Sequence, residues 1–169
     1  IEKLSLINLN VKDTFCFAVI SDTHFDYDIL EKTVYKINND KEALFLIHLG
    51  DITDNGLLNE FKWINEKLSK LKIPYITIIG NHDYLSNGKK VYKKMYGETN
   101  FTFTFNKIKF ICFDDIVWEN NNNYPDFNWL NINLSNRLNY NQVFVLSHIP
   151  PIKDQIDDYF ESTYGEILL

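Results

Sequence analysis

The chain has 169 residues, of which 45% are hydrophobic and 15% aromatic, enough apolar material for one domain with a sizeable core. This composition excludes disorder as the main state. The formal net charge is −6 and Arg137 is the only arginine, so the chain lacks the basic surface with which proteins bind a nucleic-acid backbone non-specifically. The longest apolar runs fall far short of the roughly 20 residues that a membrane-spanning helix needs, so we expect no transmembrane segment.

Short apolar runs alternate with helical patterns in the first half of the chain. We expect strands at residues 15–21, 43–49 and 75–79, where runs rich in Val, Ile and Phe are bounded by Asp, Asn, Gly or Pro. Apolar residues at helical spacing predict helices over residues 29–37 and 57–71. This β-α-β-α-β order indicates parallel strands joined by right-handed crossovers, with helices on at least one face of the sheet.

The connections change to antiparallel in the second half of the chain. A short helix is expected over residues 88–96, with Gly97 as its C-cap. Residues 101–105 and 107–113 predict a hairpin, because two strand-like runs are joined by a tight turn near Asn106.

One more helix and one more strand are predicted after the hairpin. The Asn-rich run at residues 120–123 is typical of a loop, and Asp126 is suited to the N-cap of a following helix. Residues 142–147 have the composition of a last strand. Since no internal repeat or linker is visible, we interpret residues 1–169 as a single domain.

Four of the predicted strands end in residue types that bind metals. The strand ends carry Asp22-Thr23-His24, Gly50-Asp51, Gly80-Asn81-His82-Asp83 and Ser147-His148. In a mostly parallel sheet the carboxyl ends of the strands lie along one edge, so residues remote in sequence converge in one crevice. The side chains that we expect to meet there are Asp22, His24, Asp51, Asn81, His82 and His148.

The chemistry of these side chains suits divalent cations. Carboxylate oxygen, imidazole nitrogen and amide oxygen, without a thiolate, are typical ligands of ions such as Mn, Fe or Zn. Two such ions about 3.5 to 4 Å apart clamp a phosphoryl group and lower the pKa of a bridging water, which makes hydroxide available as the nucleophile. The pattern therefore indicates a hydrolytic site that needs no serine or cysteine nucleophile.

The four motifs, in this order and each after a strand, resemble the D-x-H, G-D, G-N-H-D and H motifs of the calcineurin-like metallophosphoesterases. The resemblance extends from about Phe15 to Pro151 and includes Thr53, Asp54 and Gly56. It implies an α/β fold, a mixed-sheet αββα sandwich flanked by helices. It also implies a phosphatase or phosphodiesterase that hydrolyses a phosphomonoester or phosphodiester with a dinuclear metal centre.

The resemblance also implies a role for each metal ligand. Asp22 and His24 correspond to ligands of the first metal, and Asp51 to the carboxylate that bridges both metals. Asn81 and His148 correspond to ligands of the second metal.

Two further roles concern the reaction itself. His82 corresponds to a histidine that contacts the substrate phosphate and helps to protonate or stabilise the leaving oxygen, and we expect Asp83 to orient its ring. Asp54 either caps the helix that begins near Gly56 or steadies a metal ligand. His48 lies inside a strand run, so we expect a core histidine that tolerates Gln better than His82 does.

The sequence departs from the family pattern at its end. The pattern closes with a downstream G-H-x-H, whereas the histidines here are His24, His48, His82 and His148 and the chain ends at Leu169. We therefore expect a domain that is cut just before its last motif. Acidic residues after Pro151 offer oxygen ligands, but carboxylates near a terminus are more often solvated.

Two alternatives to a catalytically complete single chain follow from this departure. One is a non-catalytic binding module or inactive fragment whose metal site is incomplete. The other is a site that a neighbouring copy completes in trans. Truncation also predicts an open sheet edge, which favours a homodimer.

The substrate stays open among phosphodiesters, nucleotides, phosphoproteins and small phosphomonoesters, since specificity depends on loops around the site. A richness in Asn, Lys and Ile makes the chain similar to metallophosphoesterases of secreted or envelope-anchored bacterial lipoproteins. This similarity implies a bacterial parent protein with an extracytoplasmic or envelope-anchored location.

Overall fold

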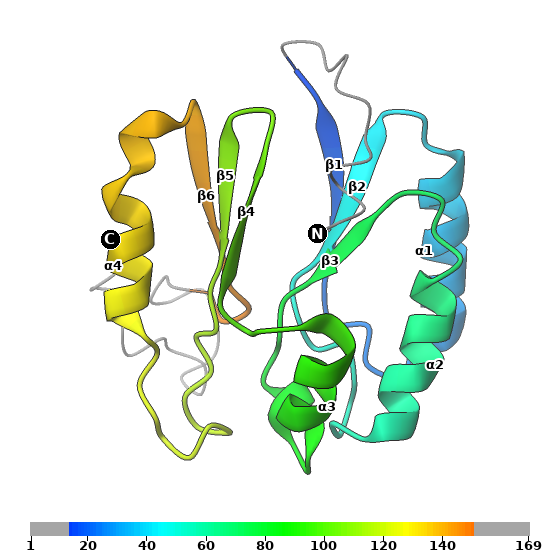
Figure 1. The fold of residues 1–169 in the computed structure, drawn as a ribbon. Coiled ribbons are helices and arrows are strands. Elements are labelled where there is room, and N and C mark those ends of the chain that lie inside the picture. Colours follow the sequence, from blue (N-terminus) through cyan, green and yellow to red (C-terminus); the bar gives the residue numbers. More distant parts are fainter. Residues whose placement is uncertain (1–13, 151–169) are drawn as a thin grey trace.

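The computed structural model describes residues 14–150 as two packed sheets with helices outside them (Figure 1). The first sheet has the strand order β1-β2-β3, and the second has the order β4-β5-β6. In Figure 1 the sheets face each other in the middle, α1 and α2 cover the outer face of the first sheet, and α4 covers that of the second. This arrangement is the αββα sandwich that the sequence predicts.

The first sheet is built from crossover units. Its elements are β1 (Cys16–Ile20), α1 (Tyr27–Asn39), β2 (Ala43–His48), α2 (Leu58–Leu68) and β3 (Tyr75–Thr77). All neighbouring strands are parallel, which confirms the predicted β-α-β-α-β order. Ile20 pairs with His48, and His48 pairs with Thr77. The three strands therefore end level with one another, and the loops that follow them start from one edge.

The second sheet combines a hairpin with a parallel strand. Its strands are β4 (Phe101–Phe105), β5 (Ile108–Cys112) and β6 (Gln142–Leu146). The predicted turn between β4 and β5 is confirmed, with positive φ angles of 48° at Asn106 and 60° at Lys107. β5 and β6 run parallel, and Cys112 pairs with Leu146. The loops after these two strands therefore also start side by side.

The remaining helices are short, and two of their ends carry a residue suited to a cap. They are a short 3-10 helix (His82–Tyr84), α3 (Gly88–Tyr96), α4 (Phe127–Ser135) and a second 3-10 helix (Arg137–Asn139). Gly97 follows α3 with a φ of 108°, a conformation that glycine adopts without strain. Asp126 accepts a hydrogen bond of 2.9 Å from the backbone N–H of Trp129, which confirms the predicted N-cap of α4.

Phenylalanine rings fill the space between the two sheets. Phe45 of β2 and Phe110 of β5 are fully buried, and their ring centroids lie 5.9 Å apart in an edge-to-face contact. Phe103 stacks on Phe110 at 4.6 Å. Such contacts add to the free energy gained from burying the rings, so this core fixes the distance between the two sheets.

Separate apolar layers hold the helices to the outer faces. Leu30 and Val34 of α1 and Phe61 and Ile64 of α2 pack in one buried cluster with Leu46 of β2. On the opposite face, the buried residues Ile111, Phe113 and Leu130 form the layer under α4. Because successive residues of a strand point to opposite faces, β2 and β5 each serve two layers.

The outer strands of the described sheets are β1 and β3 in one and β4 and β6 in the other. Val19 of β1 and Val145 of β6 are 48% and 42% exposed. Association of two copies through a sheet edge stays a prediction. Within residues 14–150, none of the helices has the length and apolar character needed to cross a membrane.

Replacing Phe110 by alanine is expected to lower the free energy of unfolding by about 3–5 kcal/mol, because a fully buried ring leaves a cavity. Urea denaturation followed by circular dichroism measures the change. Leu138→Ala is the control, because Leu138 is 90% exposed and its removal should change stability by less than about 0.5 kcal/mol. Equal effects of the two substitutions would contradict the assigned core.

Candidate metal centre

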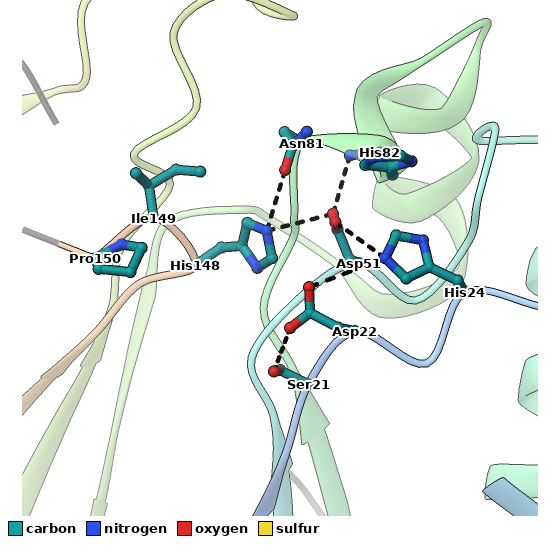
Figure 2. A pocket seen from close by; sticks show the side chains of 9 residues that line it. All are labelled: Ser21, Asp22, His24, Asp51, Asn81, His82, His148, Ile149 and Pro150. Carbon is teal, nitrogen blue, oxygen red and sulfur yellow. Dashed lines mark hydrogen bonds and ion pairs between the residues drawn. The ribbon is translucent and has the colours of Figure 1, made fainter. Parts of the chain in front are cut away.

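A pocket of about 440 Å³ lies at the carboxyl edge of the strands (Figure 2). The residues that line it are Ser21, Asp22, His24, Asp51, Asn81, His82, His148, Ile149 and Pro150. They follow β1, β2 and β3 of the first sheet and β6 of the second. The structure thus brings together all six side chains that the sequence predicts to meet, from four separate segments.

The loops after β1 and β2 hold each other in an unusual backbone conformation. The backbone N–H of Asp22 donates to Gly50 O at 3.0 Å, and that of His24 donates to Asp51 O at 3.2 Å. The φ angles of Asp22, His24 and Asp51 are 54°, 40° and 52°. A non-glycine residue in this region costs roughly 1–3 kcal/mol and is typical of functional sites, so the loops keep their shape through these mutual contacts.

Two glycines allow the loops to approach so closely. A Cβ atom on Gly80 would lie 2.1 Å from the backbone nitrogen and 2.2 Å from Oδ1 of Asp51. A Cβ atom on Gly50 would lie 2.7 Å from Nδ1 of His148, and Gly50 also has a φ of 99°. Any side chain at either position would displace a candidate metal ligand.

Asp51 lies at the centre of the pocket and is 3% exposed. Its Oδ1 accepts a hydrogen bond of 2.9 Å from the backbone N–H of His82 and lies 3.4 Å from Nε2 of His148. Its Oδ2 lies 3.5 Å from Nε2 of His24. The two oxygens therefore face different histidines, as a carboxylate that bridges two cations would require.

Asp51 and His148 change each other's pKa. Burial favours the neutral form of both groups, but the hydrogen bond and the opposite charge of the partner outweigh it. The pKa of His148 is raised to about 9, and the pKa of Asp51 is lowered. Each side chain thus stabilises the charged form of the other.

Hydrogen bonds fix the orientation of the His148 ring. Its Nδ1 lies 2.8 Å from Leu49 O, and since a carbonyl only accepts, Nδ1 carries a proton and donates. Its Nε2 lies 3.1 Å from Oδ1 of Asn81 and therefore faces the pocket. A backbone carbonyl that holds one ring nitrogen while the other points at the site is typical of metal-ligating histidines.

Asp54 lies beside two histidines of the pocket. Its Oδ1 is 3.5 Å from Nδ1 of His24, and its carbonyl oxygen accepts a hydrogen bond of 2.7 Å from Nδ1 of His82. The N-cap of α2 is Leu57 rather than Asp54. Of the two roles left open by the sequence, the position beside a ligand is therefore the one that the structure supports.

The role expected of Asp83 was wrong. Its carboxylate is fully buried and accepts hydrogen bonds from the backbone N–H groups of Ile52, Thr53 and Gly80 and from the Thr53 hydroxyl, over 2.8–3.1 Å. The His82 ring is held instead by the carbonyl of Asp54. Asp83 thus organises the backbone next to Asp51, because so many donors converge on its two oxygens.

His48 is a core residue, as the sequence predicts. It is fully buried, and its Nε2 lies 2.9 Å from the Thr23 hydroxyl. Burial, assisted by the charge of His148, lowers its pKa to about 3. A neutral His48 therefore supports the residue between Asp22 and His24 without lining the pocket.

The donor set fits divalent cations. Two groups of side chains each place ligand atoms within 4.8 Å of one another, and they share Asp51; the groups are His24, Asp51 and His82, and Asp22, Asp51 and His148. Nitrogen and oxygen donors of this kind suit Mn, Fe or Zn. His82 falls in the group of His24 and Asp22 in that of His148, but Oδ1 of Asp22 also lies 3.9 Å from Nε2 of His24, the partner with which the sequence places it at the first cation.

Two acidic residues near the pocket escaped the sequence analysis. The backbone N–H of Ile149 donates to Oδ1 of Asp115 at 3.3 Å, and Nδ2 of Asn81 donates to Oε1 of Glu119 at 3.3 Å. Burial, opposed by hydrogen bonds from Ile149 and Ser147, raises the pKa of Asp115 to about 6. An available signal was the Asp114-Asp115 pair directly after a strand-like run.

Replacing Asp83 by asparagine is expected to lower the free energy of unfolding by about 2 kcal/mol or more, because an amide group would meet donors that now bind a carboxylate. Chemical denaturation of the metal-free chain measures the loss. Asp28→Asn, at an exposed carboxylate in the first turn of α1, should change stability by less than about 1 kcal/mol. Equal stability of the two variants would contradict the assigned role.

Curated relatives share parts of this sequence. An uncharacterized metallophosphoesterase of Bacillus subtilis is 30% identical over 87% of this chain and 55% of its own length. A probable cyclic nucleotide phosphodiesterase of Xenorhabdus bovienii is 33% identical over 39% of this chain and 27% of its own length. A probable glycerophosphodiester phosphodiesterase of Arcobacter nitrofigilis is 33% identical over 44% of this chain and 32% of its own length. The chain therefore spans between about a quarter and about half of these relatives.

A solved structure shares the fold. A dimetal phosphatase from Danio rerio superposes with a TM-score of 0.74 over 91% of this chain and 76% of its own, at 12% sequence identity. The family model described as calcineurin-like phosphoesterase matches residues 16–168, nearly the whole chain. Together with the pocket at the strand ends, this match shows that the chain belongs to the calcineurin-like phosphoesterase family.

Proposed function

We propose that this chain carries the catalytic centre of a metal-dependent phosphodiesterase. One observation carries the proposal: the side chains of Asp22, His24, Asn81, His82 and His148, from four loops counting that of Asp51, converge around the buried carboxylate of Asp51. On an open surface, water would solvate each of these polar side chains. Here a strained backbone holds them close to one another. Such an arrangement is costly in free energy and is typical of a site built for charged ligands.

Two divalent cations in this pocket would neutralise phosphoryl oxygens and supply hydroxide at neutral pH by lowering the pKa of water. The residues proposed to hold them are Asp22, His24, Asp51, Asn81 and His148. Asp51 is suited to the shared position, because its two oxygens face His24 on one side and His148 on the other.

His82 is proposed to transfer a proton to the leaving oxygen. The hydrogen bond from its Nδ1 to the carbonyl of Asp54 fixes the ring and leaves Nε2 as the nitrogen available to a substrate. The side chain is 36% exposed, so solvent and substrate reach it. A histidine held in this way is suited to general acid catalysis.

A phosphodiester is the proposed substrate class. Among the described residues that line the pocket there is neither Lys nor Arg, so they offer no fixed cation for the second negative charge of a phosphomonoester. Two relatives with partial matches are named as phosphodiesterases, one for cyclic nucleotides and one for glycerophosphodiesters. Both observations favour the singly charged diester over the doubly charged monoester.

Replacing Asp51 by asparagine is expected to abolish binding of both cations and all hydrolysis, because one carboxylate serves both sites. Metal content after reconstitution with Mn²⁺ and desalting, together with turnover of bis(p-nitrophenyl) phosphate, measures the effect. Asp28→Asn is the control and should behave as the unaltered chain. Full metal content in Asp51→Asn would contradict the assignment, and unaltered chain that binds Mn²⁺ without turning over any phosphoester would indicate a binding module.

Replacing His82 by alanine is expected to keep the metal content and to lower turnover by about 10²-fold, the usual contribution of a general acid. The backbone N–H that donates to Asp51 is retained in this variant. His48→Gln is the matched control, because the glutamine amide is able to keep a hydrogen bond with the Thr23 hydroxyl and most of the turnover should remain. Loss of a cation from His82→Ala would instead identify His82 as a ligand.

A further inference from the structure

We propose that the segment after β5, residues 113–119, positions two of the ligands of the second cation, with Asp115 acting on His148 and Glu119 acting on Asn81. This inference rests on the proposed function, because it concerns one of the two cations of that site. Neither acidic residue lines the pocket. Both are therefore positioning residues rather than ligands.

Asp115 binds the chain on both sides of His148. Its Oδ1 accepts the backbone N–H of Ile149 at 3.3 Å, and it is also hydrogen-bonded to the side chain of Ser147. The parallel ladder leads to this contact, since Cys112 pairs with Leu146 and the N–H of Phe113 donates to Leu146 O at 2.9 Å. One carboxylate thus fixes the backbone from which the His148 side chain extends.

These contacts of Asp115 add to the hydrogen bond made by the ring of His148. Nδ1 of His148 donates to Leu49 O in the first sheet, whereas Asp115 belongs to the second sheet. The ring is therefore held by a loop of the first sheet, and the backbone that carries it is held by a loop of the second sheet. Such double fixation determines where Nε2 lies relative to Asp51 and Asn81.

Glu119 determines which end of the Asn81 amide faces the pocket. Asn81 is 9% exposed, and its Nδ2 donates to Oε1 of Glu119 at 3.3 Å. A carboxylate only accepts hydrogen bonds, so it selects the amide nitrogen and turns Oδ1 toward His148 (Figure 2). A cation binds the oxygen of an amide and not its nitrogen. Glu119 therefore favours the orientation that is able to bind metal.

Contacts with the 3-10 helix, with α3 and with Asn100 anchor the segment that carries these two carboxylates. The hydroxyl of Tyr84 donates to Asp114 in a short hydrogen bond. Nζ of Lys89, in α3, lies 3.7 Å from Oδ2 of Asp114 and 3.4 Å from Oδ1 of Asn120. The backbone N–H of Asp114 also donates to Asn100 at 2.7 Å. The segment is therefore tied to the rest of the fold on both sides of Glu119 and Asp115.

The ligands of the first cation are held differently. The N–H groups of Asp22 and His24 bond to the backbone of Gly50 and Asp51, and Asp54 lies beside His24. These contacts lie within the first sheet and its loops. Removing the hydrogen bonds of Asp115 or Glu119 should therefore weaken binding of the second cation and leave binding of the first unchanged.

The test is Mn²⁺ titration of the 169-residue chain, followed by calorimetry and by the electron paramagnetic resonance signal of free Mn²⁺. Glu119→Ala and Asp115→Ala should each weaken binding of the second ion by about 10- to 100-fold, the usual effect of losing a group that orients a ligand. Binding of the first ion should change less than twofold. Glu119→Gln should restore most of the affinity, because its amide oxygen still accepts from Asn81.

Glu98→Ala serves as the control, since Glu98 is an exposed carboxylate paired with Lys93. Unchanged binding of both ions in Glu119→Ala and Asp115→Ala would overturn this inference and leave the proposed function intact. Equal weakening of both ions would also overturn it, because it would indicate a general structural role. Failure of the unaltered chain to bind two ions would overturn the proposed function together with the inference.

Discussion

A nearly buried carboxylate, Asp51, stands where the loops after β1, β2, β3 and β6 meet. Burial makes a negative charge costly unless donors or opposite charges compensate for it. The backbone N–H of His82 and the side chain of His148 supply that compensation. The absence of a Cβ atom at Gly50 and Gly80 lets these groups come close enough. Much of the arrangement of side chains in the pocket therefore follows from the need to stabilise the buried charge of Asp51.

A second buried carboxylate keeps the first in position. Asp83 binds the backbone of Ile52 and Thr53 directly after Asp51, and also the backbone of Gly80. Burial still raises its pKa to about 6 despite these hydrogen bonds. The two carboxylates differ in what surrounds them: backbone donors saturate Asp83, whereas histidines and open space surround Asp51. The same residue type thus supports the loop in one place and presents its oxygens to the pocket in the other.

Most of the fold and the set of converging side chains follow from the sequence, because parallel strands bring their carboxyl ends to one edge whatever their register. The positions of Asp115 and Glu119 beside His148 and Asn81 do not follow from the sequence. β5 belongs to a hairpin, and only its parallel pairing with β6 places Asp115 beside His148. That pairing joins strands that are remote in sequence, and no local pattern specifies it. The role of Asp83 was mistaken for a similar reason, since proximity in sequence to His82 does not reveal which backbone donors its carboxylate meets.

The location of the pocket between the two sheets links its geometry to the core. The first sheet contributes Asp22, His24, Asp51, Asn81 and His82, whereas His148 comes from the second sheet. The 3.4 Å between His148 and Asp51 therefore depends on how far apart the sheets lie. Packed phenylalanine rings set that spacing, and close-packed interiors resist compression. A rigid aromatic core is thus a means of keeping the two sides of the pocket in register, while Asp115 binds the backbone next to His148 on the side that comes from the second sheet.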